Sequence, residues 1–228
     1  MWLPLCLGME DSAVLARKPE LGETATYAVT RRFDDESEKS VLEWKDELTV
    51  KVSQRDSLGA FYQTMSWTAV GLTLDGVALE VGKSTPFSYL QRHDKLGAFI
   101  SRDPDPDDTP LQFRYARSWT LGLPARAVKV GESWDTKFAG EEDVPGIPCV
   151  SRLKLVELKD GVASVEVRFW EKKPEAPLKA IGTATLDVAS GQVRDLHLDY
   201  QNAPIPGGEG APCAMHLDWV RSDLVAAK

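Results

Sequence analysis

Apolar and polar residues alternate along much of the chain. In residues 42–53 most even positions are apolar and the odd positions are polar, which is typical of a strand with one buried face. The alternation returns near residues 165–169, 196–200 and 215–219. Turn dipeptides typical of tight hairpins separate such runs, at Asp75-Gly76, Asp160-Gly161 and Ser190-Gly191. The pattern predicts an all-β protein with at most one or two short helices.

Two segments are less clear. Residues 111–123 alternate and predict a strand, but Thr109-Pro110 would also make a good N-cap and first residue of a helix, which is the alternative. Residues 86–102 contain Gly97 within an Asp-Lys-Leu-Gly turn, so they favour a hairpin over a helix.

The predicted strands fall into two halves. Residues 104–110 are acidic and rich in proline, as in a linker, and they separate a first β-meander at residues 20–103 from a second at residues 111–228. Each half opens on Gly-Glu and contains a Gly turn followed by a strand that ends in tryptophan, so we expect an internal repeat. Two antiparallel meanders would form curved sheets, as a sandwich or an open barrel.

Charge and length exclude several partners. The chain has 228 residues and a net charge of −8, and no long basic run occurs, which disfavours nucleic acid and anionic membrane surfaces as partners. No segment approaches the ~20 apolar residues of a transmembrane helix. Residues 1–19 begin with an apolar run without a basic residue, and two interpretations stay open. One is the remnant of a signal peptide, which predicts a secreted or periplasmic protein, and the other is a loose hydrophobic tail.

The segment Gly82-Lys83-Ser84-Thr85 resembles the end of a phosphate-binding loop. The first glycine of that motif would fall on Val77, and Pro86 stands where a helix should already have begun. We therefore predict the end of a hairpin strand and no nucleotide binding.

Recognisable catalytic or cofactor-binding motifs do not occur in the sequence, and we expect no cofactor. His93 adjoins a predicted turn and is expected to be solvated. His197 and His216 lie on neighbouring predicted strands, and each shares its polar face with aspartates. That face is either a solvated surface with cross-strand pairs or, as the alternative function, the metal site of a hydrolase. The aspartates are Asp195, Asp199 and Asp218.

Seven tryptophans favour a large aromatic core, although a curved sheet can also enclose an apolar pocket. The leading hypothesis is a non-catalytic protein that binds an apolar or amphipathic small ligand or an envelope partner, or that has a structural role in the envelope. The tryptophans on or beside predicted strands are Trp44, Trp67, Trp119, Trp134, Trp170 and Trp219.

Cys149 and Cys213 open the first and fifth strands of the second meander, and both share parity with apolar positions. In an up-and-down meander these strands run in the same direction, so both cysteines lie at one end of the sheet. The pattern leaves two outcomes open: a disulfide, as expected in an oxidising compartment, or two buried thiols that never meet.

The segment LPARAVKVGESW at residues 123–134 resembles a motif of a family of uncharacterised bacterial exported proteins, a domain of unknown function. The segment GTATLDVASG at residues 182–191 is similar to that family's later strand and turn. The resemblance implies an exported β-rich protein and supplies no catalytic residues.

Overall fold

The structure is a computed structural model that describes residues 12–36, 38–80, 86–103, 110–138, 147–172, 175–205 and 212–223. Strands dominate these ranges, as the alternation predicted. The strands before the helix are β1 (Ser12–Leu15), β2 (Thr24–Asp35), β3 (Ser40–Arg55), β4 (Phe61–Leu74), β5 (Val77–Ala78), β6 (Phe87–His93) and β7 (Phe99–Arg102). The helix α1 (Pro110–Trp119) follows, and then β8 (Arg126–Lys129), β9 (Ser133–Phe138), β10 (Cys149–Lys159), β11 (Val162–Glu171), β12 (Lys179–Asp187), β13 (Val193–Ala203) and β14 (Cys213–Arg221).

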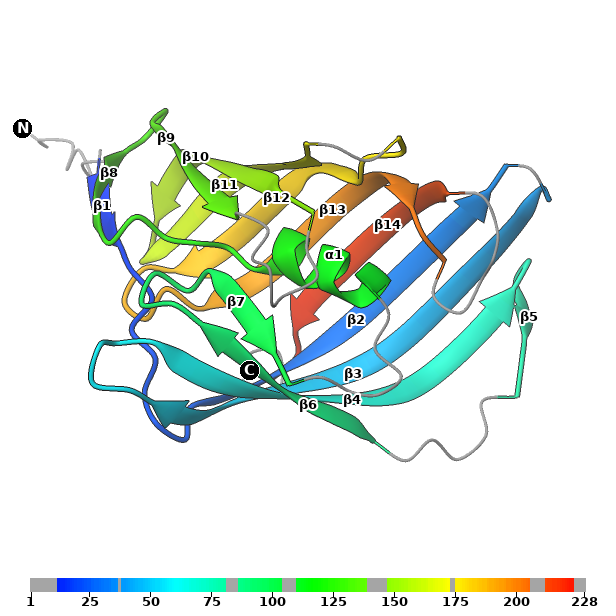
Figure 1. Ribbon diagram of the computed structural model, residues 1–228, viewed down its shortest axis with the longest axis horizontal. Helices are drawn as coiled ribbons and strands as arrows, with labels where there is room; N and C mark the ends of the chain where they lie inside the picture. The colour runs from blue at the N-terminus through cyan, green and yellow to red at the C-terminus, as the bar shows by residue number, and fades with distance from the viewer. Residues whose placement is uncertain are drawn as a thin grey trace, which may run out of the picture.

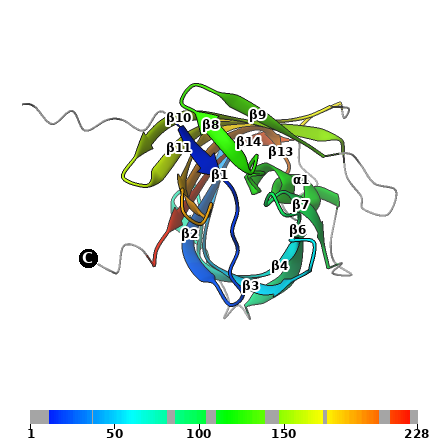
Figure 2. The same cartoon turned by 90° about the vertical axis from the view of Figure 1, so that its left-hand side faces the viewer.

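Twelve strands form one antiparallel sheet in the order β7-β6-β4-β3-β2-β14-β13-β12-β11-β10-β9, with β5 added on β4. Each half of the chain is a meander, and the two meanders join where β14 pairs with β2. The sheet curls strongly, so that in the end-on view it wraps around an interior without closing into a barrel (Figure 2). The predicted all-β class is therefore confirmed, with both halves in a single sheet.

Alternation along the strands places the core on the concave side. On β3, Leu48 and Val52 are almost fully buried while Glu47 and Lys51 are exposed. The parity of β10 switches at a β-bulge between Leu155 and Glu157, where the register with β11 shifts. A bulge at this switch keeps Leu158 on the buried face.

The Asp-Gly turns have the geometry that their sequences predict. Asp75 and Gly76 both adopt positive φ, at 51° and 79°, and Asp160 and Gly161 do the same at 51° and 74°. Two successive positive φ values define the type I′ turn, whose twist matches that of a hairpin. The return arm after Gly76 pairs only as the short β5, and Gly82-Lys83-Ser84-Thr85 lies outside the described residues.

Residues 110–119 form a helix, so the predicted strand was wrong and the alternative holds. The alternating apolar residues of this segment include Leu111, Tyr115 and Trp119, which are also spaced by four as on one face of a helix. Pro110 is the first helical residue, where its missing N–H has no cost. α1 has ten residues, and no helix in the described ranges is long and apolar enough to cross a membrane.

Helix α1 lies on the concave side of the sheet (Figure 1), where polar contacts hold it. Arg114 donates from Nε and Nη2 to the two carboxylate oxygens of Glu171, at 2.8 and 2.6 Å. Glu171 is only 5% exposed, so this pair is deeply buried. Ser118 Oγ and Tyr200 Oη lie 2.7 Å apart, which ties the end of the helix to β13. These contacts fix the position of Trp119 and of the segment that follows it.

The segment before β2 belongs to the folded body, which differs from the predicted tail at residues 1–19. β1 pairs with β8, and Leu15 is 1% exposed. Beyond β1 the chain crosses the end of the curled sheet and packs against the β12–β13 turn. Gly191 adopts a φ of +68°, and a Cβ there would lie 2.3 Å from Ala16 O, so only glycine allows this approach. Residues 1–11 lie outside the described residues.

The Gly-Glu openings of the two halves make equivalent backbone contacts. Gly22 N donates to Val52 O at 2.9 Å, and Val52 N donates to Glu23 O at 2.9 Å. In the second half Gly131 N donates to Leu155 O at 2.7 Å, and Leu155 N donates to Glu132 O at 3.0 Å. Both glycines have positive φ, so each half begins with the same local turn.

Candidate ligand-binding site

A cavity of about 80 Å³ lies on the concave side of the sheet, at the end crossed by the N-terminal segment. Its walls come from β2, β3, β4, β6 and β14, from the residues around the end of α1, and from the β12–β13 turn. The apolar lining consists of Val50, Phe61, Met65, Trp119, Leu121, Val193 and Trp219. The polar lining includes Arg17, Tyr27, Gln63, Gln91, His93 and Gln192.

Aromatic rings form one side of the cavity. Trp119 and Trp219 meet edge to face, with ring centroids 5.9 Å apart. Tyr27 contacts Trp219 in the same manner at 5.3 Å, and its hydroxyl donates to Val193 O at 2.9 Å. These contacts fix the indole rings, so this wall is rigid and largely apolar.

Four buried polar atoms on residues lining the cavity have no hydrogen-bond partner: Nε2 of Gln91, Nε2 of His93, and Nε1 of Trp119 and Trp219. Gln91 is 1% exposed and His93 is 4% exposed. Buried polar side chains in folded proteins almost always find a partner, because an unpaired buried group costs about 1–3 kcal/mol. Residues that carry four such atoms line this one cavity, which makes it a candidate site for a polar group from outside.

His93 is buried at the end of β6, so the prediction of a solvated turn histidine was wrong. Its ring stacks on that of Phe61 at a centroid distance of 4.9 Å. Nδ1 lies 3.2 Å from Gly97 O, and since a carbonyl only accepts, Nδ1 carries the proton. Burial lowers the pKa of His93 to about 4, so the ring is neutral near neutral pH and Nε2 is an acceptor.

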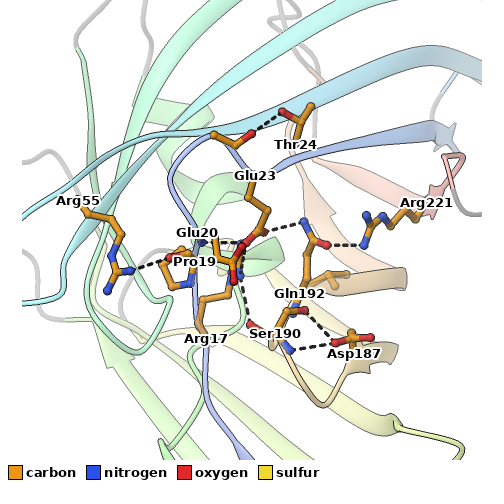
Figure 3. A network of polar contacts seen from close by, with 12 residues as sticks. Arg17, Pro19, Glu20, Glu23, Thr24, Arg55, Asp187, Ser190, Gln192 and Arg221 are labelled. Atoms are coloured by element: carbon orange, nitrogen blue, oxygen red, sulfur yellow. Dashed lines mark hydrogen bonds and ion pairs between the residues drawn. The ribbon is translucent and has the colours of Figure 1, made fainter.

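Arg17 lines the cavity, but its charge is already paired (Figure 3). Its guanidinium forms an ion pair with Glu23 and donates to Ser190 O at 3.2 Å. Gln192 Nε2 donates to the same carboxylate at 2.9 Å, and the Gln192 carbonyl accepts from Arg221. This network anchors the N-terminal segment to the β12–β13 turn and leaves no unpaired ion among the described residues that line the cavity.

Carboxylates and candidate nucleophiles do not line the cavity. Among the described residues that surround it, no Asp, Glu, Ser or Cys occurs. The hydroxyl of Thr120 donates to Ala116 O and is therefore occupied. The lining thus combines apolar surface with a few uncharged polar groups, which is typical of binding sites for small ligands.

His197 and His216 lie on the opposite face of the sheet, as predicted. His197 Nδ1 lies 2.6 Å from Asp218 Oδ1, and His216 Nδ1 lies 2.7 Å from Asp199 Oδ1. Each histidine is directly opposite its aspartate in the β13–β14 register, so these are cross-strand pairs. Asp195 instead accepts from the Thr185 hydroxyl at 2.8 Å. Within the described ranges, no group of three or more His, Cys, Asp or Glu has an arrangement suited to a metal ion.

Cys149 and Cys213 are buried free thiols, which is the second of the two outcomes that the sequence pattern left open. Both face the core at one end of the sheet, as the parity argument predicted. Strands β11, β12 and β13 lie between them, and neighbouring strands are spaced about 4.8 Å apart. Across that distance the curvature does not bring the two sulfur atoms together. Burial raises the pKa of Cys149 to about 12 and that of Cys213 to about 11.

The other tryptophans lie on both the concave and the outer face of the sheet. Trp134 is buried and donates from Nε1 to Gly122 O at 2.9 Å. Trp44 and Trp67 are half-buried against the core, and Arg31 stacks over both rings. Trp170 lies under Arg152 on the outer face. Only Trp119 and Trp219 among these six line the cavity.

Sequence reasoning missed Gln91 and His93 as site residues. A usable signal was present, because both share the inward parity of β6 with the half-buried Tyr89. A polar residue at an inward position needs a partner or a ligand. A second signal is the repeated D-x-L-G-A-F at residues 56–61 and 94–99, whose two turns have the same backbone hydrogen bonds and which place Phe61 and Gly97 in the lining.

Comparison with known proteins yields no match: no family model, curated protein or solved structure is similar to this chain.

Proposed function

We propose that this chain is a non-catalytic binding protein that takes a small apolar or amphipathic ligand into the cavity beside Trp119 and Trp219. The observation that carries the proposal is the combination of a rigid apolar wall with four buried polar atoms that lack partners. The apolar body of an amphipathic ligand would cover the apolar wall, and its polar end would pair with the polar atoms that lack partners.

The energetics favour a ligand over a purely structural core. An unpaired buried donor is destabilising, and an apolar side chain of similar shape would avoid that cost. Gln91 occupies such a position directly opposite Gln63, in the centre of the β4–β6 pair. A bound polar group would supply the missing partner, so the free energy that the unliganded fold loses would be recovered as binding affinity.

A catalytic role has less support. Nucleophilic and acid–base catalysis need a reactive group beside a base, and the described lining has no carboxylate, serine or cysteine. The metal-assisted hydrolase remains the alternative, but the two histidine side chains on which it would depend are 44% and 42% exposed, and each is already paired with an aspartate.

Export to the periplasm or the medium is part of the proposal and rests on the family resemblance of residues 123–134. The internal repeat was predicted separately, from the sequence pattern of the two halves, and their equivalent Gly-Glu turns support it. A ligand-carrying protein of the envelope would combine these properties, and an envelope partner protein would be the donor or acceptor of its ligand.

Ligand binding is tested by titration with 1-octanol, followed by tryptophan emission, because two indoles line the cavity. We expect a saturable change that is lost in Val50→Phe, which fills the cavity. Val52→Phe is the matched control, since it adds the same volume to the same face of β3 at a residue that does not line the cavity. A response that does not saturate, or that persists unchanged in Val50→Phe, would contradict the proposal.

A further inference from the structure

We infer that the cavity selects a ligand whose buried end is uncharged and carries a carbonyl oxygen together with an O–H or N–H donor. An amide, or an ester beside a hydroxyl, has this chemistry. The inference rests on the proposed function, because it specifies the ligand class of the same site, and it follows from the kinds of polar atom that lack partners there.

Three of the four unpaired atoms are donors. The indole Nε1 of Trp119 and that of Trp219 can only donate, and the Gln91 side-chain nitrogen is also a donor. A carbonyl oxygen has two lone pairs, and an ester or a hydroxyl adds another acceptor. The ligand must therefore offer at least one acceptor oxygen, and an amide carbonyl can accept from two of these three donors.

The fourth atom is an acceptor. His93 Nδ1 donates to Gly97 O, and the low pKa of the buried ring, about 4, leaves Nε2 without a proton. An O–H or N–H on the ligand would fill this position. The stacking on Phe61 fixes the ring plane, so the acceptor has a defined direction.

An anionic head is disfavoured because the described residues of the lining offer it no free cation. Arg17 is paired with Glu23, and its guanidinium also donates to Ser190 O. A carboxylate placed here would lose its hydration without gaining an ion pair, which is costly. Burial lowers the pKa of His93 to about 4, so the ring is neutral at neutral pH and does not supply a positive charge either.

A cationic head is disfavoured for a related reason. An ammonium has only donors, and three of the four unpaired atoms are donors themselves. The described lining contains no carboxylate that would pair with it. An uncharged head with both functions can pair with donors of this set and with the His93 acceptor without a desolvated ion.

The test is a calorimetric titration at neutral pH with three ligands that share an octyl-type chain and differ in the head: octanamide, octanoate and octylammonium. We expect octanamide to bind at least about tenfold more tightly than either ion. Gln91→Leu and Trp219→Phe each remove one donor and should weaken octanamide binding by about three- to tenfold. Ser151→Ala is the control, because Ser151 Oγ is also buried and unpaired but does not line the cavity.

The outcomes distinguish ligand binding by the cavity from its selectivity for the head group. If no ligand binds, the proposed function fails and this inference with it. If all three bind with similar affinity and Val50→Phe abolishes all three, the cavity is a binding site but its selectivity is not as inferred. Equal octanamide affinity in the parent protein, Gln91→Leu and Trp219→Phe would likewise overturn the inference.

Discussion

The imidazole ring of His93 lies flat against the phenyl ring of Phe61, with the ring planes 7° from parallel. This stacking, together with the contact between Nδ1 and Gly97 O, holds a neutral histidine inside the curled sheet. The same residue therefore links the turn at residues 94–98 to the cavity. Its burial has consequences for stability that can be measured.

The pH dependence of stability should carry the signature of His93. Its pKa is about 4 in the folded protein against 6.5 as the ordinary value, so the unfolded chain takes up the proton first as pH falls. This group then destabilises the fold progressively between about pH 6.5 and pH 4, by about 3 kcal/mol in total, and has no effect above that range.

Urea unfolding of the parent protein and of His93→Gln at several pH values measures this effect. The parent should lose about 3 kcal/mol relative to the variant on acidification. His197→Gln, which changes a histidine on the outer face, is the control and should not remove the loss. Parallel pH profiles for the parent and His93→Gln would show that folding does not lower the pKa of His93.

Replacement of Gln91 by leucine should stabilise the protein in the absence of ligand. The change removes a buried amide nitrogen that lacks a partner, and the expected gain in the free energy of unfolding is about 1–2 kcal/mol. Gln63→Leu, directly opposite on β4, is the matched control with an expected change of under about 0.5 kcal/mol. Chemical denaturation decides between this and a structural role for Gln91, which predicts destabilisation instead.

The buried pair of Arg114 and Glu171 should be essential for docking α1. Glu171→Gln leaves the arginine without its counter-charge, and we expect a loss of about 3–5 kcal/mol in unfolding free energy. The matched exposed pair is Asp135 with Arg152, which has the same two-bond geometry, and Asp135→Asn should cost only about 0–1 kcal/mol. Similar losses in both variants would indicate that burial of the first pair contributes nothing.

The cysteines should both be found as thiols. After denaturation without reductant, alkylation followed by peptide mass spectrometry should modify both Cys149 and Cys213, because three strands separate them in the sheet. In the native protein both should react slowly, since burial raises their pKa values to about 12 and about 11. A peptide pair linked through the two residues would contradict this arrangement.

The fold was predictable largely because strand alternation is a local property. The two faces of β3 can be identified from its own sequence, because the buried Leu48 and Val52 alternate with the exposed Glu47 and Lys51. The sequence of α1 fits both a strand and a helix. Its apolar residues stand at every second position, as in a strand, and some of them are also spaced by four, as on one face of a helix. Packing of Tyr115 against Tyr200 and of Arg114 against Glu171 resolves this ambiguity, and both contacts are distant in sequence.

The candidate site was not predictable in the same way. Gln91 and His93 lie on β6, Trp219 lies on β14, and Trp119 ends α1, so only the curl of the sheet brings them together. The sequence pattern could not decide between a disulfide and two separate thiols for a related reason, since parity and strand direction give the face and the end of a sheet but not the distance across it. The inward polar residues on β6 and the repeated D-x-L-G-A-F were local signs of the site.

Native mass spectrometry of the protein purified from its own host tests the central claim most directly. We predict that a fraction of the parent protein retains a small uncharged amphiphile in the cavity lined by Gln91, His93, Trp119 and Trp219. Val50→Phe should retain none, and Val52→Phe should retain it as the parent does. A parent protein that carries no such adduct and gains none on addition of octanamide, or an adduct that is equally abundant in Val50→Phe, would contradict it.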